Sequence, residues 1–233
     1  MFIPIRDDQP TSRTPHLTIG LIFINTAIFL YSQTLGAQGH SVFVTYFGFT
    51  PLYYLNFGTE YIGPTWYYVT PLTSMFLHGG WIHLIGNMLF LWIFGNNIED
   101  YLGPVKFVFF YVISGLAAVA LYTLFNPNSP VPLVGASGAI AGVMGAYMVL
   151  HPRARITVLI LFVFIFIRQF PARVVLGLWF FYQILMWLAD SSTGGGVAWM
   201  AHVGGFIFGY LVLKTIFKIR GGPRQRIQRV QWW

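Results

Sequence analysis

The chain contains 233 residues, of which 56% are hydrophobic and only 8% are charged. Because an ordinary soluble domain carries about 25% charged residues, this composition excludes a typical water-soluble domain and favours a membrane protein. The formal net charge is +7, and its meaning depends on where the basic residues lie. The sequence has no cysteine, so disulfides and thiolate metal sites are excluded.

Apolar segments follow one another along the chain, and most of them approach the ~20 residues that a helix needs to span hydrocarbon. They are residues 17–35, 71–94, 105–125, 137–150, 174–189 and 197–216. We therefore expect an all-α integral membrane protein with six transmembrane helices. The polar, charged start of the chain is unlike a cleavable signal peptide, so the first segment is expected to stay in the mature protein.

Lys and Arg residues occupy alternate connections between these segments. They precede the first segment, lie between the second and third and between the fourth and fifth, and follow the sixth. Residues 36–70, 126–136 and 189–196 contain none, so the positive-inside rule places these connections outside and both termini in the cytoplasm. We expect a cytoplasmic segment at residues 1–16, a six-helix domain at 17–217 and a basic tail at 218–233.

Two cytoplasmic segments need separate interpretation. Residues 156–167 form an apolar run too short to span a bilayer, and a crossing there would send the basic tail outside, so we expect a buried or interfacial segment. The tail combines basic residues with Trp232 and Trp233. This combination favours contact with anionic lipid at the membrane surface over nucleic-acid binding.

The outer connection, residues 36–70, is rich in aromatic residues, which favour the membrane interface. We expect this loop to lie partly in the bilayer. A structural interface belt and a role in admitting substrate both remain open.

Polar side chains within the apolar segments are costly at membrane depth, so each needs a partner or a function. His83 and Asn87 lie one helical turn apart, Ser137 opens the fourth segment and His202 lies near the start of the sixth. With the second segment taken as one inward helix at 1.5 Å per residue, His83 lies about 15 Å deep. The four side chains are then expected to share a layer in the outer half of the membrane.

Small residues recur every four positions on the two helices that carry the serine and the histidine. They are Ser137, Ala141 and Gly145 on one helix, and Ala201, Gly205 and Gly209 on the other. Such spacing brings membrane helices into close contact. Taken alone it is more often structural than catalytic, and its combination with Ser137 and His202 favours catalysis.

These groups permit acyl transfer by a Ser-His dyad. A neutral imidazole at His202 can take the proton of Ser137, whose place at a helix start also offers free backbone N–H groups to an oxyanion. His83 and Asn87 can add donors. Gly135 and Gly138 flank the serine and let a substrate carbonyl approach. Asp190 lies in an outer loop, so we expect no third member of a triad.

The motifs resemble those of the rhomboid family of intramembrane serine proteases. His83-Leu84-Ile85-Gly86-Asn87 is similar to the family's His-xxx-Asn, and Gly95-Asn96-Asn97-Ile98-Glu99 to its Gly-xxx-Glu. Gly135-Ala136-Ser137-Gly138 is similar to its GxSG, and Ala201-His202 with Gly205 and Gly209 to its AHxxGxxxG. The resemblance also takes in the opening Ile3-Pro4-Ile5-Arg6-Asp7 and so covers nearly the whole chain.

The resemblance implies Ser137 as nucleophile, His202 as general base, and His83, Asn87 and the Ser137 backbone N–H as oxyanion donors. It also implies an endopeptidase without metal or cofactor that cuts transmembrane segments of other proteins. The short termini and the lack of a targeting segment favour a prokaryotic plasma membrane, with an organelle membrane as the alternative. Two departures stand out. Trp66 is followed by Tyr67 where many members have Arg, and Ala141 stands where some members stack an aromatic ring on the histidine.

Three alternative functions can be compared with a serine protease. A non-catalytic rhomboid-like binder or chaperone of transmembrane helices is the main alternative, and the intact Ser137 and His202 argue against it. A transporter would be expected to show matched interrupted helices or an internal repeat, which the sequence lacks. A zinc protease would need a His-Glu-x-x-His motif, and His78 and His83 are five residues apart.

Overall fold

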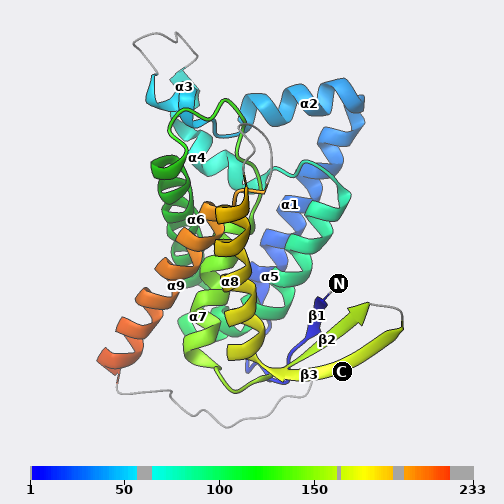
Figure 1. Cartoon of the computed structure of the whole chain (residues 1–233), viewed down its shortest axis with the longest axis vertical. Helices are drawn as coiled ribbons and strands as arrows, with labels where there is room; N and C mark the ends of the chain where they lie inside the picture. The colour runs from blue at the N-terminus through cyan, green and yellow to red at the C-terminus, as the bar shows by residue number, and fades with distance from the viewer. Residues whose placement is uncertain (1, 57–64, 162–163, 191–196, 221–233) are drawn as a thin grey trace.

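The computed structural model describes residues 2–56, 65–161, 164–190 and 197–220. Within them, six helices run between two ends of the molecule (Figure 1). They are α1 (His16–Thr34), α5 (Trp81–Leu102), α6 (Pro104–Phe125), α7 (Ser137–Leu150), α8 (Ala172–Ala189) and α9 (Trp199–Arg220). The predicted tail beyond residue 220 and part of the aromatic connection, residues 57–64, lie outside the described residues.

The connection between α1 and α5 folds at one end of the bundle (Figure 1). It contains the short helices α2 (Gly36–Phe47), α3 (Pro51–Leu55) and α4 (Thr70–Thr73), and the 3-10 turns η1 (Thr65–Val69) and η2 (Ser74–Phe76). Its aromatic rings pack on one another, as Phe43 does on Phe47 and Phe49 on Tyr54. Whether this connection enters the bilayer stays a prediction.

Helices confirm five of the six predicted segments, and the second needs correction. Residues 71–94 are not one continuous helix, because the chain bends by 77° between Tyr67–Phe76 and Trp81–Leu102. The bend falls at Gly79-Gly80, where Gly80 is extended and α5 begins directly after it. His83 therefore lies in the first turn of α5, and the unbroken helix on which the depth of about 15 Å rests is wrong. The depth of His83 in the membrane stays a prediction.

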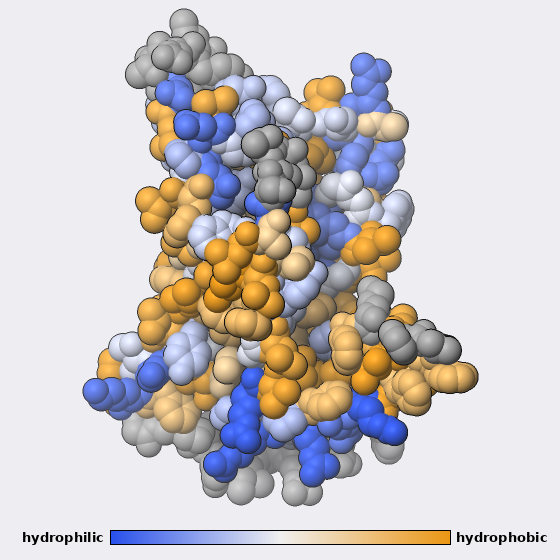
Figure 2. All heavy atoms as spheres, viewed as in Figure 1, coloured by the Kyte–Doolittle hydropathy of each residue, from blue (hydrophilic) through white to orange (hydrophobic). Residues whose placement is uncertain are grey.

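The apolar helices differ in how much they face outward. Among the described residues, α1, α6, α8 and α9 are each long and apolar enough to cross a membrane, and α5 makes a fifth together with the bent segment before it. Figure 2 shows hydrophobic side chains across the middle of one face, with hydrophilic groups at both ends. Helix α7 has only 14 residues and is buried from Gly138 to Tyr147, because the other helices surround it.

A small β-sheet corrects the expectation of an all-α fold. Strands β1 (Phe2–Arg6), β2 (Arg155–Leu161) and β3 (Ile165–Pro171) pair antiparallel in the order β1-β2-β3. The predicted buried or interfacial segment, residues 156–167, thus contributes its described residues mainly to strands β2 and β3. The sheet lies at the end of the bundle opposite α2 and α3 (Figure 1). Strand β1 joins the first described residues to this sheet, so residues 2–16 are part of the folded unit.

Glycines bring α7 and α9 into backbone contact. A β-carbon on Gly209 would lie 1.9 Å from the carbonyl oxygen of Gly142, and one on Gly145 would lie 2.1 Å from that of Phe206. On α9, Gly205 and Gly209 of the predicted small-residue face lie against the α7 backbone. On α7 the face includes Gly142 as well as the predicted Gly145, while Ala141 is fully buried.

Candidate active site

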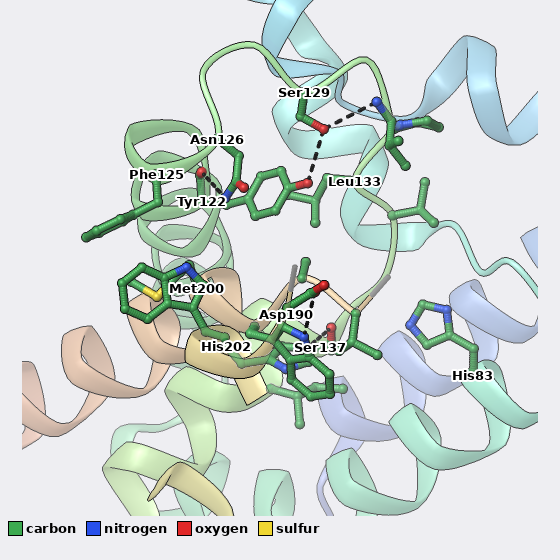
Figure 3. A pocket seen from close by; sticks show the side chains of 18 of the residues that line it. His83, Tyr122, Phe125, Asn126, Ser129, Leu133, Ser137, Asp190, Met200 and His202 are labelled. Atoms are coloured by element: carbon green, nitrogen blue, oxygen red, sulfur yellow. Dashed lines mark hydrogen bonds between the residues drawn. The ribbon is translucent and has the colours of Figure 1, made fainter. Parts of the chain in front are cut away.

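Three helix starts meet at the candidate site (Figure 3). Ser137 is the first residue of α7, His83 the third of α5 and His202 the fourth of α9. Asn87 follows His83 by one turn. The residues before Ser137 form a non-helical segment that ends at Gly135 with φ at +125°, a conformation that L side chains rarely adopt.

Ser137 and His202 form a direct pair. The Oγ of Ser137 lies 2.8 Å from Nε2 of His202, which is a normal hydrogen-bond distance. Both side chains are half-buried. The two predicted catalytic residues, 65 positions apart in sequence, are therefore brought into the geometry that a nucleophile and its base require.

Gly135 holds His83 close to this pair. A β-carbon at Gly135 would lie 2.7 Å from Nε2 of His83 and 3.5 Å from Oγ of Ser137. The backbone N–H of Gly135 donates to the carbonyl of Ser74, which fixes the segment before the serine. The ring of His83 packs edge-on against His78, with 5.1 Å between centroids.

Asn87 supplies an amide group without a protein partner. Its side chain is 8% exposed, and within the described part of the chain Nδ2 has no hydrogen-bond acceptor. The same residue lines the cavity that contains Ser137 and His202. Because buried amide donors are normally paired, an unpaired one beside the dyad is a candidate donor to a bound oxygen. The backbone N–H of Ser137 belongs to the first turn of α7, where such groups lack intrahelical partners.

Helix α8 supplies the groups that hold His202. Nδ1 of the imidazole lies 2.8 Å from Oε1 of Gln183, and the ring of Trp179 lies 5.7 Å from the imidazole, tilted by 37°. Trp179 thus provides an aromatic contact although position 141 is alanine. Asp190 accepts a hydrogen bond from the indole of Trp199 at 3.2 Å.

The other departure from the family pattern, at Tyr67, also has a structural counterpart. Tyr67, which stands where many members have Arg, is buried. Its hydroxyl accepts from the backbone N–H of Thr50 and donates to the carbonyl of the same residue, both at 3.1 Å. Nearby, Phe49 and Leu133 exchange backbone hydrogen bonds. The connection between α1 and α5 is therefore tied to the segment that leads to Ser137.

The site opens into a cavity of about 990 Å³. Its wall includes His83, Asn87, Ser137 and His202, the segment from Asn126 to Val134, and aromatic side chains of α6, α8 and α9. Figure 3 shows His83 and the Ser137–His202 pair on the wall of this space. In the described part of the chain, no three His, Asp or Glu side chains are grouped so as to hold a metal ion.

Sequence reasoning missed Gln183 and Trp179. One signal was present, because Gln183 is the only amide side chain in the apolar run 174–189 and a polar group at membrane depth needs a partner. Its partner was not predictable, since pairing with His202 depends on how α8 is rotated against α9.

Comparison with known proteins decides the family. The family model of the Rhomboid domain matches residues 65–219, which is more than half of the chain. The chain belongs to the rhomboid family. This rhomboid is a multi-pass membrane protein, in agreement with its apolar helices.

Relatives of this rhomboid come from several compartments. Rhomboid protein 1, mitochondrial, of Saccharomyces cerevisiae is 31% identical over 179 residues, covering 71% of this chain and 47% of the yeast protein. Rhomboid protease GluP of Bacillus subtilis is 30% identical over 156 residues, covering 66% of this chain and 26% of that protein. Rhomboid-like protein 11, chloroplastic, of Arabidopsis thaliana is 26% identical over 221 residues, covering 91% of this chain and 70% of that protein.

This rhomboid therefore spans about half the length of its yeast relative and about a quarter of the bacterial one. Because mitochondrial, chloroplastic and bacterial proteins are all among the relatives, a prokaryotic plasma membrane stays a prediction.

Proposed function

We propose that this rhomboid is an intramembrane serine endopeptidase that cleaves transmembrane segments of other membrane proteins. The observation that carries the proposal is the 2.8 Å contact between Oγ of Ser137 and Nε2 of His202 at the wall of a large cavity. A serine becomes a useful nucleophile when an adjacent base removes its proton. The relative from Bacillus subtilis is named a rhomboid protease, which agrees with this chemistry.

In the proposed reaction, Oγ of Ser137 attacks the scissile carbonyl carbon while its proton passes to Nε2 of His202. The oxyanion receives hydrogen bonds from the backbone N–H of Ser137 and the side chains of His83 and Asn87. The carbon–nitrogen bond then breaks, His202 returns the proton to the leaving amine, and an ester remains on Ser137. His202 next removes a proton from water as the water oxygen attacks the ester carbonyl carbon. The bond from that carbon to Oγ then breaks, His202 returns the proton to Oγ, and a carboxylic acid is released.

The proposal includes a topology. We take α1, α5, α6, α7, α8 and α9 as six spans within residues 17–217, with residues 1–16 and 218–233 in the cytoplasm. Strand β1 and the β2–β3 hairpin lie at one end of the bundle, as expected of segments on one side. Ser137 begins the short helix α7, so the cavity would open towards the outer side, where transmembrane substrates enter from the bilayer.

A cleavage assay tests the function directly. Purified protein in liposomes should cleave a single-span model substrate near its outer end and should react with a fluorophosphonate probe. Ser137→Ala should lose both activities. Ser114→Ala is the matched control, because Ser114 is a fully buried serine on α6 outside the dyad, and it should retain both.

Other outcomes of this assay identify the alternatives. Equal labelling of wild type and Ser137→Ala would refute the assigned nucleophile. A folded wild-type protein that binds the model substrate and neither cleaves it nor reacts with the probe would instead support a non-catalytic rhomboid-like binder or chaperone.

A further inference from the structure

We propose that Gln183 is a positioning residue that fixes the tautomer of His202, with the proton on Nδ1 and the lone pair of Nε2 facing Ser137. The role of this tautomer in peptide cleavage rests on the proposed function, whereas the tautomer itself is a property of the folded protein. The inference follows from the hydrogen bonds of one amide group.

The orientation of the Gln183 amide is set by its own helix. Nε2 of Gln183 lies 3.2 Å from the backbone carbonyl oxygen of Trp179. A carbonyl oxygen only accepts hydrogen bonds, so the amide nitrogen must be the end that faces it. The opposite end, Oε1, is then the group that lies 2.8 Å from Nδ1 of His202.

The orientation of the Gln183 amide determines which ring nitrogen of His202 carries the proton. An amide oxygen is an acceptor only, so Nδ1 of His202 has to carry the proton that joins it to Gln183. In a neutral ring the other nitrogen, Nε2, is then an acceptor. That nitrogen lies 2.8 Å from Oγ of Ser137, where an acceptor receives the hydroxyl proton. The alternative tautomer would set two lone pairs against each other at Gln183.

The burial of Gln183 explains why an amide, and not a carboxylate, accepts the hydrogen bond from His202. Gln183 is only 3% exposed, and a neutral amide costs much less to bury than a carboxylate does. Trp179 lies one turn before Gln183 on α8 and packs its ring against the same imidazole. One helix therefore provides both the acceptor and the ring that hold His202, while the dyad itself lies on α7 and α9.

Nitrogen NMR of protein labelled with ¹⁵N in the histidine rings measures the tautomer without any substrate. The signals of His202 are assigned by their loss in His202→Asn. In mildly alkaline buffer, where imidazoles are neutral, we expect a protonated Nδ1 and an unprotonated Nε2. Gln183→Met keeps the length of the side chain and removes the acceptor, so its His202 signals should shift towards a mixture of both tautomers.

Cleavage kinetics give the second readout. In Gln183→Met we expect kcat to fall about tenfold to a hundredfold, less than the whole contribution of a general base, which is about 10²–10⁴. The KM should stay within about twofold, because Gln183 is expected to affect the chemical step alone. Leu178→Ala is the control on α8, since Leu178 is 64% exposed, and it should change neither the tautomer nor kcat.

The two readouts separate two kinds of failure. A wild-type His202 protonated on Nε2, or an unchanged Nδ1 tautomer in Gln183→Met, would refute the role of Gln183 even if the protein is a protease. Absence of cleavage by wild type would refute the proposed function, while the NMR result would still decide the tautomer. Loss of the folded state in Gln183→Met would leave the wild-type tautomer as the deciding measurement.

Discussion

The α-carbon of Gly205 lies against the backbone carbonyl oxygen of Gly138, so that a β-carbon on Gly205 would stand 2.0 Å from that oxygen. Gly138 directly follows Ser137 on α7, and Gly205 follows His202 by three residues on α9. The backbones that carry the two members of the dyad are therefore in contact beside the dyad itself. Because both groups at this contact are backbone atoms, neither can rotate away from an added methyl group.

Gly205→Ala should separate α7 from α9 and disrupt the dyad. Overpacking of a tight core costs about 1–3 kcal/mol, and a displacement of about 1 Å at reacting groups can cost about a hundredfold in rate. We expect a lower melting temperature in detergent and a fall in kcat of about that size, measured on the model substrate.

Gly177→Ala is the matched control for this substitution. Gly177 lies on α8, and no described atom would come within 4 Å of its added β-carbon. Alanine favours a helix over glycine by up to about 1 kcal/mol, so stability should stay equal or rise and activity should persist. Equal losses in the two variants would contradict the contact between Gly205 and Gly138 as the cause.

Asn87→Ala tests the oxyanion donors. Asn87 lines the cavity that contains the dyad, and within the described part of the chain its Nδ2 has no hydrogen-bond partner. Removing one oxyanion donor costs about 10²–10³ in kcat. We expect a loss of this size with little change in KM, because the developing oxyanion exists in the transition state and not in the bound substrate.

Asn25→Ala supplies the comparison for Asn87. Asn25 is also buried, but it lies on α1 and donates to the carbonyl of Leu21 on its own helix. Its replacement should leave kcat unchanged. Full activity in Asn87→Ala would remove Asn87 from the proposed oxyanion site.

Some features of the fold and of the candidate site could be predicted from the sequence because they depend on local chemistry. Ser137 and His202 were selected because polar groups in apolar helices need partners, and the structure brings them within 2.8 Å. The bend at Gly79-Gly80 was missed because hydropathy alone does not distinguish one long span from a bent pair. The apolar stretch from Arg155 to Leu161 was not recognised as strand β2, since its pairing with β1 joins residues far apart in sequence.

Residues whose role depends on the rotation of a helix about its axis could not be predicted from the sequence either. Gln183 and Trp179 contact His202 from α8, and the sequence of α8 does not state which of its faces turns towards α9. Ala141 stands where some family members have an aromatic ring that stacks on the histidine. The structure supplies the ring from another helix, which shows that a motif position and the physical task it performs are separable.

Glu99→Gln tests the second sequence motif, Gly95-xxx-Glu99. Oε1 of Glu99 accepts from the backbone N–H of Leu17, and Oε2 accepts from the backbone N–H and hydroxyl of Thr18. A β-carbon on Gly95 would lie 3.2 Å from Thr18, so the two motif residues hold the start of α1 together. A glutamine would turn its amide hydrogens towards backbone donors.

We expect Glu99→Gln to lose about 1–3 kcal/mol of stability, the cost of leaving a buried polar group unpaired, measured as a lower melting temperature. The neighbouring Asp100 accepts from Ser12 in an exposed position, where water can replace a lost bond. Asp100→Asn should therefore change stability by no more than about 0.5 kcal/mol. A larger effect at Asp100 than at Glu99 would contradict this account.

Asp7 provides a test by pH at the end of the bundle that carries the sheet. Burial raises the pKa of the Asp7 carboxyl from its ordinary value of 3.8 to about 6, and the neighbouring Asp8 adds to the rise. Hydrogen bonds to Oδ2 from Tyr147, at 2.5 Å, and from Asn97, at 3.0 Å, oppose it. The folded protein therefore holds the Asp7 proton more tightly than the unfolded chain does, so its contribution to stability is complete below pH 3.8 and is lost as the pH rises through about 6.

Asp7→Asn should remove this dependence, because an amide does not ionise while its oxygen can still accept from Tyr147 and Asn97. Melting temperatures of both proteins in detergent are compared across the interval from pH 3.8 to about 6. The melting temperature of wild type should fall relative to that of the variant as the pH rises, and the difference should level off above the upper limit. Carboxylates that do not interact with Asp7 contribute equally in both proteins and cancel in this difference. A wild type that gains stability relative to Asp7→Asn over the same interval would mean that the hydrogen bonds outweigh burial and that the Asp7 carboxyl is ionised in the folded protein.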